Sequence, residues 1–126
     1  MKLLLAVALG GALGAVGRHF VAGQALRLVG GGFPVGTLSV NVIGSFVLGV
    51  LVGLMALKWS VGPELRAFLV VGLLGGFTTF SAFSLDVVLL FERGNLPAAA
   101  AYVLATVVLS IGGLFAGLLA CRHLLS

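Results

Sequence analysis

Acidic residues are almost absent from this sequence, which holds only three of them, Glu64, Asp86 and Glu92, among 126 residues. Charged residues of both signs make up 8% of the chain, whereas soluble domains carry about 25%. Hydrophobic residues make up 61%. So few charges cannot cover an apolar core with a hydrated surface. We therefore exclude a soluble globular domain and predict an integral membrane protein.

The sequence also lacks the residue clusters that enzymes and side-chain metal centres require. Its two histidines, His19 and His123, have no carboxylate or cysteine at ligand or catalytic spacing. The single cysteine, Cys121, cannot form an intramolecular disulfide and is expected to pack as a small apolar residue. The seven lysines and arginines give a net charge of +4 but stand singly. We therefore exclude an enzyme and a nucleic-acid partner.

Long hydrophobic runs are what the chain has in abundance. We predict an all-α protein with four transmembrane helices, at about residues 3–28, 37–57, 65–91 and 96–120. Glycines, prolines and single charges separate these runs and end the helices. The first run, which follows Lys2, also resembles a cleavable signal peptide, but its mostly apolar continuation to Val29 favours a retained span.

The distribution of basic residues leaves the orientation in the membrane open. With four spans both termini lie on one side. The basic residues at or near the span ends on that side are Lys2, Lys58, Arg66 and Arg122, against Arg27 and Arg93 on the other side, with Arg18 ambiguous. So small a bias orients a chain weakly and permits insertion both ways, and hence an antiparallel homodimer. The alternative is a single orientation with cytoplasmic termini, which the same count mildly favours, so counting charges does not decide between the two.

Twenty glycines indicate closely packed helices. Lipid supplies no hydrophobic force between spans, so close approach of backbones must replace it. Small residues recur four positions apart on one helix face in three pairs: Gly10 and Gly14, Gly49 and Gly53, and Gly113 and Gly117. This pattern predicts helix association and nothing more specific.

Uncharged polar residues stand inside the predicted spans, where lipid disfavours them. Asn41 and Ser45 lie one turn apart in the second span. Tyr102, Thr106 and Ser110 recur every four residues in the fourth, which aligns their hydroxyls along one helix face. These groups either bond across helices or line a path that water and ions can reach.

The third span contains a segment that disfavours a continuous helix, because adjacent Gly75 and Gly76 precede the β-branched Thr78 and Thr79. A break there would free backbone carbonyls, which membrane proteins use to hold bare alkali cations. A kink satisfied by the threonine hydroxyls is the alternative. Phe80 and Phe83, three residues apart, would project from one side, and the electropositive edges of their rings can attract a small anion.

Three stretches together resemble the CrcB or Fluc family of small fluoride channels. They are the run Gly-Ala-Val-Gly-Arg ending at Arg18, the segment from Gly36 to Phe46, and the segment from Gly75 to Ser84. The last is highly specific, and the resemblance extends over nearly the whole chain. Two positions depart from the family pattern: Asp86 replaces an expected glutamate, and Thr106 replaces a common serine.

The resemblance implies a multi-pass protein of the cytoplasmic membrane that exports fluoride passively. Export would relieve cells of fluoride that enters as the neutral protonated form and accumulates inside by acid trapping. The resemblance also implies a dual-topology antiparallel homodimer with two pores and a structural sodium ion on the two-fold axis. The backbone carbonyls of Gly75 and Thr78 would bind sodium, and Arg18 would have a structural or vestibular role. The pore would be lined by the remaining matched residues: Asn41, Phe80, Phe83, Ser81, Tyr102, Thr106 and Ser110.

Two other classes of protein remain as alternatives. The first is a four-span, dual-topology exporter of hydrophobic cations, similar in size to the small multidrug transporters. Those transporters depend on a carboxylate in the first span, and residues 1–33 contain none. The second is a scaffolding protein held together by its glycine faces, which would form a stable oligomer without conducting ions.

Overall fold

The computed structural model describes residues 1–30 and 32–125, and this part of the chain contains helices and no strands. The elements are α1 (Lys2–Val29), α2 (Val35–Leu57), α3 (Pro63–Arg66), η1 (Ala67–Leu74), α4 (Gly75–Phe77), α5 (Ser81–Glu92) and α6 (Leu96–Leu125). Within the described residues, four segments are long and apolar enough to cross a membrane: Lys2–Val29, Val35–Leu57, Pro63–Glu92 and Leu96–Leu125. The prediction of an all-helical protein with four such segments is confirmed.

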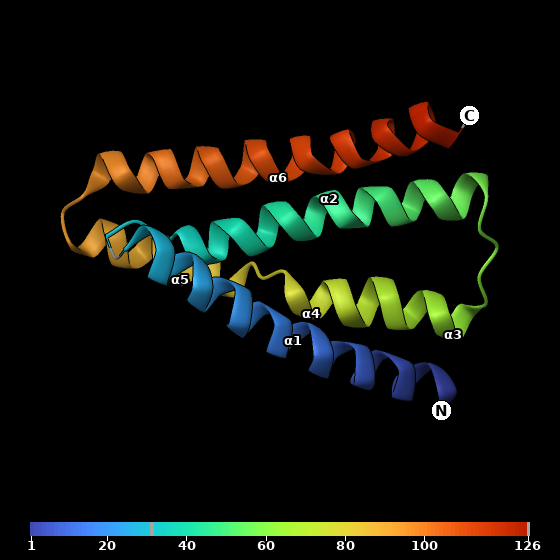
Figure 1. The fold of residues 1–126 in the computed structure, drawn as a ribbon. Coiled ribbons are helices and arrows are strands. Elements are labelled where there is room, and N and C mark those ends of the chain that lie inside the picture. The colour runs from blue at the N-terminus through green and yellow to red at the C-terminus, as the bar shows by residue number, and fades with distance from the viewer. Residues whose placement is uncertain (31, 126) are drawn as a thin grey trace.

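The four long segments run side by side, with both termini and the α2–α3 connection at one end (Figure 1). The connection between α5 and α6 is tight because Gly94 adopts a positive φ of 78°, which costs glycine little. Asn95 follows it and accepts a hydrogen bond from the Ala98 amide through Oδ1 at 3.3 Å. α6 thus begins with a capped turn, and it continues to Leu125, beyond residue 120 where we expected the span to end.

Two seams between helices depend on glycine. We call the contact of α1 with η1 and α4 the first seam and the contact of α2 with α6 the second. In the first, a Cβ built on Gly14 would collide with the carbonyl of Leu73. In the second, a Cβ built on Gly117 would collide with the carbonyl of Phe46 and lie 2.9 Å from the Val50 nitrogen. Backbones therefore touch without intervening side chains, as close packing in lipid requires.

The third membrane-spanning segment is not one uniform helix. Its first part, η1, is a π-helix, which sequence analysis did not predict. α4 ends at Phe77, Thr78 is extended with φ −89° and ψ 159°, and α5 begins at Ser81. We call residues 78–80 the α4–α5 link. A non-helical link between two apolar helices needs partners for its backbone groups, since lipid offers none.

Candidate functional site

The side chain of Asn41 on α2 supports the α4–α5 link. Its Nδ2 donates to the Thr79 carbonyl at 3.0 Å, and the Thr79 amide donates to its Oδ1 at 2.8 Å. The buried amide group thus satisfies both backbone groups of one residue, as a neighbouring β-strand would. Asn41 and Thr79 lie 38 positions apart, so no local sequence pattern could reveal this pair.

The two threonines of the link satisfy further polar groups near it. Thr78 Oγ1 donates to the Leu74 carbonyl at 2.9 Å, and Thr79 Oγ1 accepts a hydrogen bond from the Ala82 amide at 3.1 Å. The second bond satisfies one of the amide groups in the first turn of α5 that have no partner within the helix. By contrast, the carbonyl oxygens of Gly75 and Thr78 accept no hydrogen bond from any residue that the structure describes. Two backbone acceptors beside the link are therefore available to another partner.

An open groove of about 420 Å³ runs beside the link. Residues of α2, α4, the link, α5 and α6 line it: Asn41, Ser45, Gly75, Thr78, Thr79, Phe80, Phe83, Thr106, Val107, Ser110 and Ile111. The structure therefore brings together most of the residues predicted for the pore, and both residues predicted to bind sodium. We call this space the polar groove.

Two hydroxyls on the α6 wall of the polar groove have no hydrogen-bond partner among the described residues. They are Thr106 Oγ1 and Ser110 Oγ, and both atoms are buried within the protein. Leaving a buried polar group unpaired costs about 1–3 kcal/mol, so such groups usually have a partner. Both residues line the groove, so a change of side-chain rotamer would present either hydroxyl to a solute or water that enters it.

The two predicted phenylalanines lie together but differ in exposure. The ring centroids of Phe80 and Phe83 are 5.4 Å apart with planes tilted by 55°. Phe83 is 6% exposed, whereas Phe80 is 77% exposed on the single chain. One ring therefore belongs to the core of the chain and the other stands at its surface.

Tyr102 and Ser81 lie outside the polar groove. Tyr102 is fully buried behind Phe83, with ring centroids 5.2 Å apart. Its hydroxyl donates to Asp86 Oδ2 at 3.0 Å, a bond that sequence analysis did not predict. Ser81 Oγ lies 3.3 Å from Thr79 Oγ1. The expected hydroxyl series on α6 is thus divided, because only Thr106 and Ser110 face the groove.

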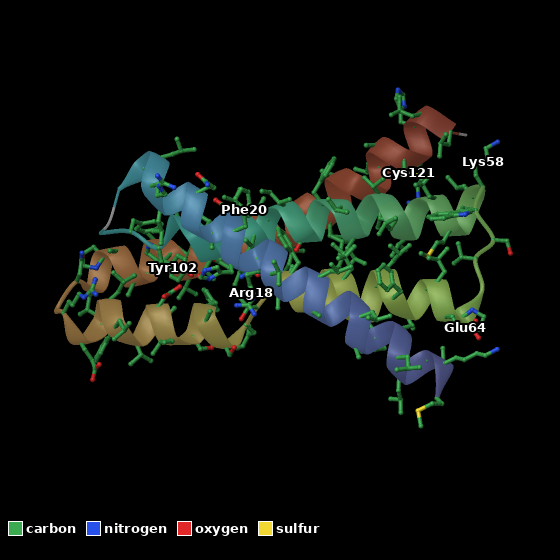
Figure 2. All side chains as sticks on the ribbon, turned by 60° about the horizontal axis from the view of Figure 1, so that its bottom comes forward. Arg18, Phe20, Lys58, Glu64, Tyr102 and Cys121 are labelled. Atoms are coloured by element: carbon green, nitrogen blue, oxygen red, sulfur yellow. The ribbon has the colours of Figure 1, made fainter. Side chains whose placement is uncertain are left out.

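Arg18 lies near the middle of the bundle, far from Lys58 and Glu64 at its end (Figure 2). Its Nε donates to the Gly76 carbonyl at 3.1 Å, so it joins α1 to the helix that precedes the link. The side chain also lines a second cavity of about 240 Å³. We call this space the α1 cavity.

The described residues that line the polar groove carry only uncharged donors and acceptors. Among the described residues, no three histidine, cysteine, aspartate or glutamate side chains come together as a metal cage. The groove instead offers hydroxyls, one amide group, ring edges and free carbonyls. Such a set can solvate a small ion without holding it as a fixed charge would.

Comparison with known proteins places the chain in a family. A family model described as CrcB-like protein, Camphor Resistance (CrcB), matches residues 5–118. A relative from Rhodospirillum centenum is 60% identical over 122 residues, which cover 97% of each protein. One from Chelativorans sp. is 57% identical over 125 residues, covering 99% of this chain and 100% of the relative. Another, from Agrobacterium fabrum, is 55% identical over 118 residues, or 94% of each.

All three relatives carry the name fluoride-specific ion channel FluC. Their similarity extends over nearly the full length of both proteins, so it includes every element that lines the polar groove. The resemblance inferred from the sequence is confirmed. The chain belongs to the CrcB family.

Proposed function

We propose that this protein is a fluoride-selective ion channel that lets fluoride leave the cell passively across the cytoplasmic membrane. The observation that carries the proposal is the pair of buried, unpaired hydroxyls of Thr106 and Ser110 on the wall of the polar groove. Relatives at 55–60% identity, named as fluoride-specific channels, support the choice of ion.

A groove of this kind suits a small, strongly hydrated anion. The hydroxyls of Thr106 and Ser110 replace part of its water shell, and the electropositive edges of Phe80 and Phe83 add weak attraction. No cationic side chain lines the groove among the residues that the structure describes. Several weak sites allow the ion to enter and also to leave, which rapid conduction requires.

The working unit in this proposal is an antiparallel homodimer. The polar groove is open along one side of the chain, and Phe80, at its edge, is 77% exposed. A second copy packed against this side would close the groove and give Phe80 a protein neighbour. Two copies would then form two pores, and the weak charge bias of the connections allows both orientations.

A structural sodium ion fits the free carbonyls beside the link. The carbonyl oxygens of Gly75 and Thr78 would hold it, since both lack hydrogen bonds among the described residues. Neutral carbonyl oxygens are the ligands that alkali cations take in channels. At the interface between the two copies, the positive charge of the ion would offset the partial negative charges of the carbonyl oxygens that each copy contributes.

The geometry gives no comparable support to a cation exporter of the small multidrug type. Asp86 is the only acidic residue inside the described spans, away from their ends, and it lies outside the polar groove. Its carboxylate accepts a hydrogen bond from Tyr102 instead. A scaffold without ion flux would leave the unpaired hydroxyls without a role.

The test is fluoride release from proteoliposomes. Purified protein should release fluoride far faster than chloride, and equal rates would reject selectivity. Phe80→Ile should reduce fluoride flux while the protein stays dimeric, because it removes the ring edge. Phe115→Ile is a matched control, since Phe115 is 60% exposed but does not line the groove. Equal loss of flux in both variants would contradict an aromatic pore.

Two further measurements test the assembly. Cross-linking between cysteines introduced at opposite ends of two copies should succeed if the copies are antiparallel, and should fail for a parallel dimer. Replacing sodium by a large organic cation during purification should weaken the dimer if the carbonyl site holds sodium. A dimer of unchanged stability would contradict the sodium assignment, but it would not bear on the proposed fluoride selectivity.

A further inference from the structure

The connection between α2 and α3 lies at a membrane surface, because it joins two membrane-spanning segments. We call residues 55–66 the α2–α3 corner. Two hydrogen bonds define its backbone: the amides of Lys58 and Trp59 both donate to the Leu54 carbonyl, at 2.8 Å and 2.7 Å. Trp59 is 39% exposed and is the only tryptophan of the chain. A tryptophan beside a lysine at the end of a span is typical of the headgroup level of a bilayer.

Two exposed basic side chains on this corner lack an acidic partner. Arg66 Nη1 donates to Met55 Sδ at 3.5 Å, and a thioether sulfur is a weak acceptor. Lys58 follows Met55 by three positions, so its side chain leaves from the same side of α2. The Lys58 ammonium forms no hydrogen bond or ion pair with any residue that the structure describes. The corner therefore presents a guanidinium and an ammonium whose donors are mostly unused.

Glu64 is the only acidic residue of the corner, and it does not neutralise these two charges. It lies at the same end of the bundle as Lys58 (Figure 2). Its place in α3 is two positions before Arg66, and residues at this spacing do not face each other on a helix. Glu64 forms no ion pair with any described residue. Two neighbouring positive charges repel each other, so an anion is the partner that the corner lacks.

The two ends of the bundle differ in charge, and the corner lies at the more positive one, which also holds both termini (Figure 1). This end has Lys2, Lys58, Arg66 and Arg122 against Glu64, and the opposite end has Arg27 and Arg93 against Glu92. Basic residues at a membrane surface attract anionic lipids. A lipid suits this anion site better than a soluble ion does, because the bilayer supplies phosphate groups at this level and Trp59 can contact the acyl chain below the phosphate.

We propose that Lys58 and Arg66 bind the phosphate of an anionic phospholipid at the α2–α3 corner. The planar guanidinium of Arg66 can donate two parallel hydrogen bonds to phosphate oxygens, and Lys58 adds a second positive charge. A zwitterionic lipid binds less well, because its own amine offsets the charge of its phosphate. The inference does not depend on fluoride conduction. In the antiparallel dimer proposed above, one corner would face each leaflet of the membrane.

The single tryptophan makes this site directly measurable, because bromine atoms on a lipid acyl chain quench tryptophan fluorescence at short range. The protein is placed in phosphatidylcholine vesicles with a rising share of brominated phosphatidylglycerol or, in a matched series, brominated phosphatidylcholine. We expect the anionic lipid to bind beside Trp59 more tightly, by about fivefold for each basic residue that contacts its headgroup. Higher ionic strength should reduce this preference. Equal quenching by the two lipids would overturn the proposal.

Two double variants assign the preference to the corner. Lys58→Gln with Arg66→Gln should make the two lipids bind equally, whereas Arg27→Gln with Arg93→Gln removes the same charge from the opposite end and should keep the preference. Size-exclusion chromatography checks that both variants are folded. A preference retained in the first variant, or lost in both, would overturn the proposal.

A comparison of salts distinguishes a lipid from a free ion. Sodium phosphate and sodium chloride of equal ionic strength should lower the preference equally, because both act by screening. A stronger effect of phosphate would indicate a site for the soluble ion and would overturn the assignment to lipid. Vesicles without selective fluoride flux would reject the proposed channel and leave the lipid result standing, since neither Lys58 nor Arg66 lines the polar groove.

Discussion

One helix, α6, borders two contrasting regions. Its second half packs on α2 in the second seam, where Gly117 brings backbone against backbone. Its first half borders the polar groove, where Thr106 and Ser110 present hydroxyls without partners. The first region leaves no room for a methyl group, and the second has a volume of about 420 Å³.

The contrast shows how a small membrane protein can keep an unfavourable site. Unpaired hydroxyls and free carbonyls destabilise the fold, and lipid provides no hydrophobic force to compensate. The glycine seams supply the compensation through close van der Waals packing. They hold α2 and α6 so that the groove cannot collapse to pair its own polar groups.

The largest effect is expected from filling the second seam. Gly117→Leu would force a side chain into the Phe46 carbonyl, where even a Cβ collides. We expect loss of folded protein, since overpacking commonly costs about 1–3 kcal/mol and more against rigid backbone. Size-exclusion chromatography and thermal unfolding in detergent measure this. Gly112→Leu is the control, because a Cβ at Gly112 would meet no atom of another described helix within 4 Å. Equal damage in both variants would refute the seam.

The next largest effect is expected from removing the side chain of Asn41, which supports the α4–α5 link. Asn41→Leu removes both hydrogen bonds to Thr79 and leaves its amide and carbonyl unpaired. We expect a loss of about 2–4 kcal/mol in unfolding free energy and of more than tenfold in fluoride flux. Ser45→Ala, one turn away on the same helix and in the same groove, should change stability little. Normal flux in Asn41→Leu would show that the link does not need this support.

The fold could largely be predicted because its determinants are local. Hydrophobic runs of sufficient length specify the four helices, and the spacing of Gly113 and Gly117 indicated a packed face. The π-helix η1 was not predicted; it lies against α1, where Gly72 brings the two backbones close together, and no local pattern in its sequence indicates the wider turn. Residues that share one helix face, such as Thr106 and Ser110, were placed together by periodicity alone.

The residues of the site could be predicted from the sequence, but the hydrogen bonds and packing contacts between them could not. Tyr102, Thr106 and Ser110 share a helix face by sequence, but sequence does not say which neighbouring helix covers each position. α5 covers Tyr102 with Phe83 and Asp86, whereas the groove begins one turn later. Arg18 likewise pairs with Gly76, 58 positions away. Such partners depend on how the helices cross, which composition and periodicity do not encode.

A smaller effect on stability is expected in the polar groove, and it is opposite in sign to the effect expected at the second seam. Thr106→Val keeps the shape of the side chain but removes an unpaired hydroxyl. We expect stability to stay equal or rise by up to about 1 kcal/mol, because a buried unsatisfied group is lost, while fluoride flux falls about tenfold. Ser110→Ala should behave alike. Thermal unfolding and fluoride efflux, measured on the same samples, separate the change in stability from the change in flux. Destabilisation would mean that the hydroxyls form hydrogen bonds within the fold.

The smallest change in flux is expected at Tyr102, although it continues the same helix face. Tyr102→Phe removes the hydroxyl that donates to Asp86 but keeps the ring packed on Phe83. The lost hydrogen bond to a carboxylate should lower unfolding free energy by about 1–2 kcal/mol. Because Tyr102 does not line the polar groove, flux should remain within about twofold of the unaltered protein. A loss as large as that of Thr106→Val would extend the conduction path one turn further along α6, past Phe83 to Asp86.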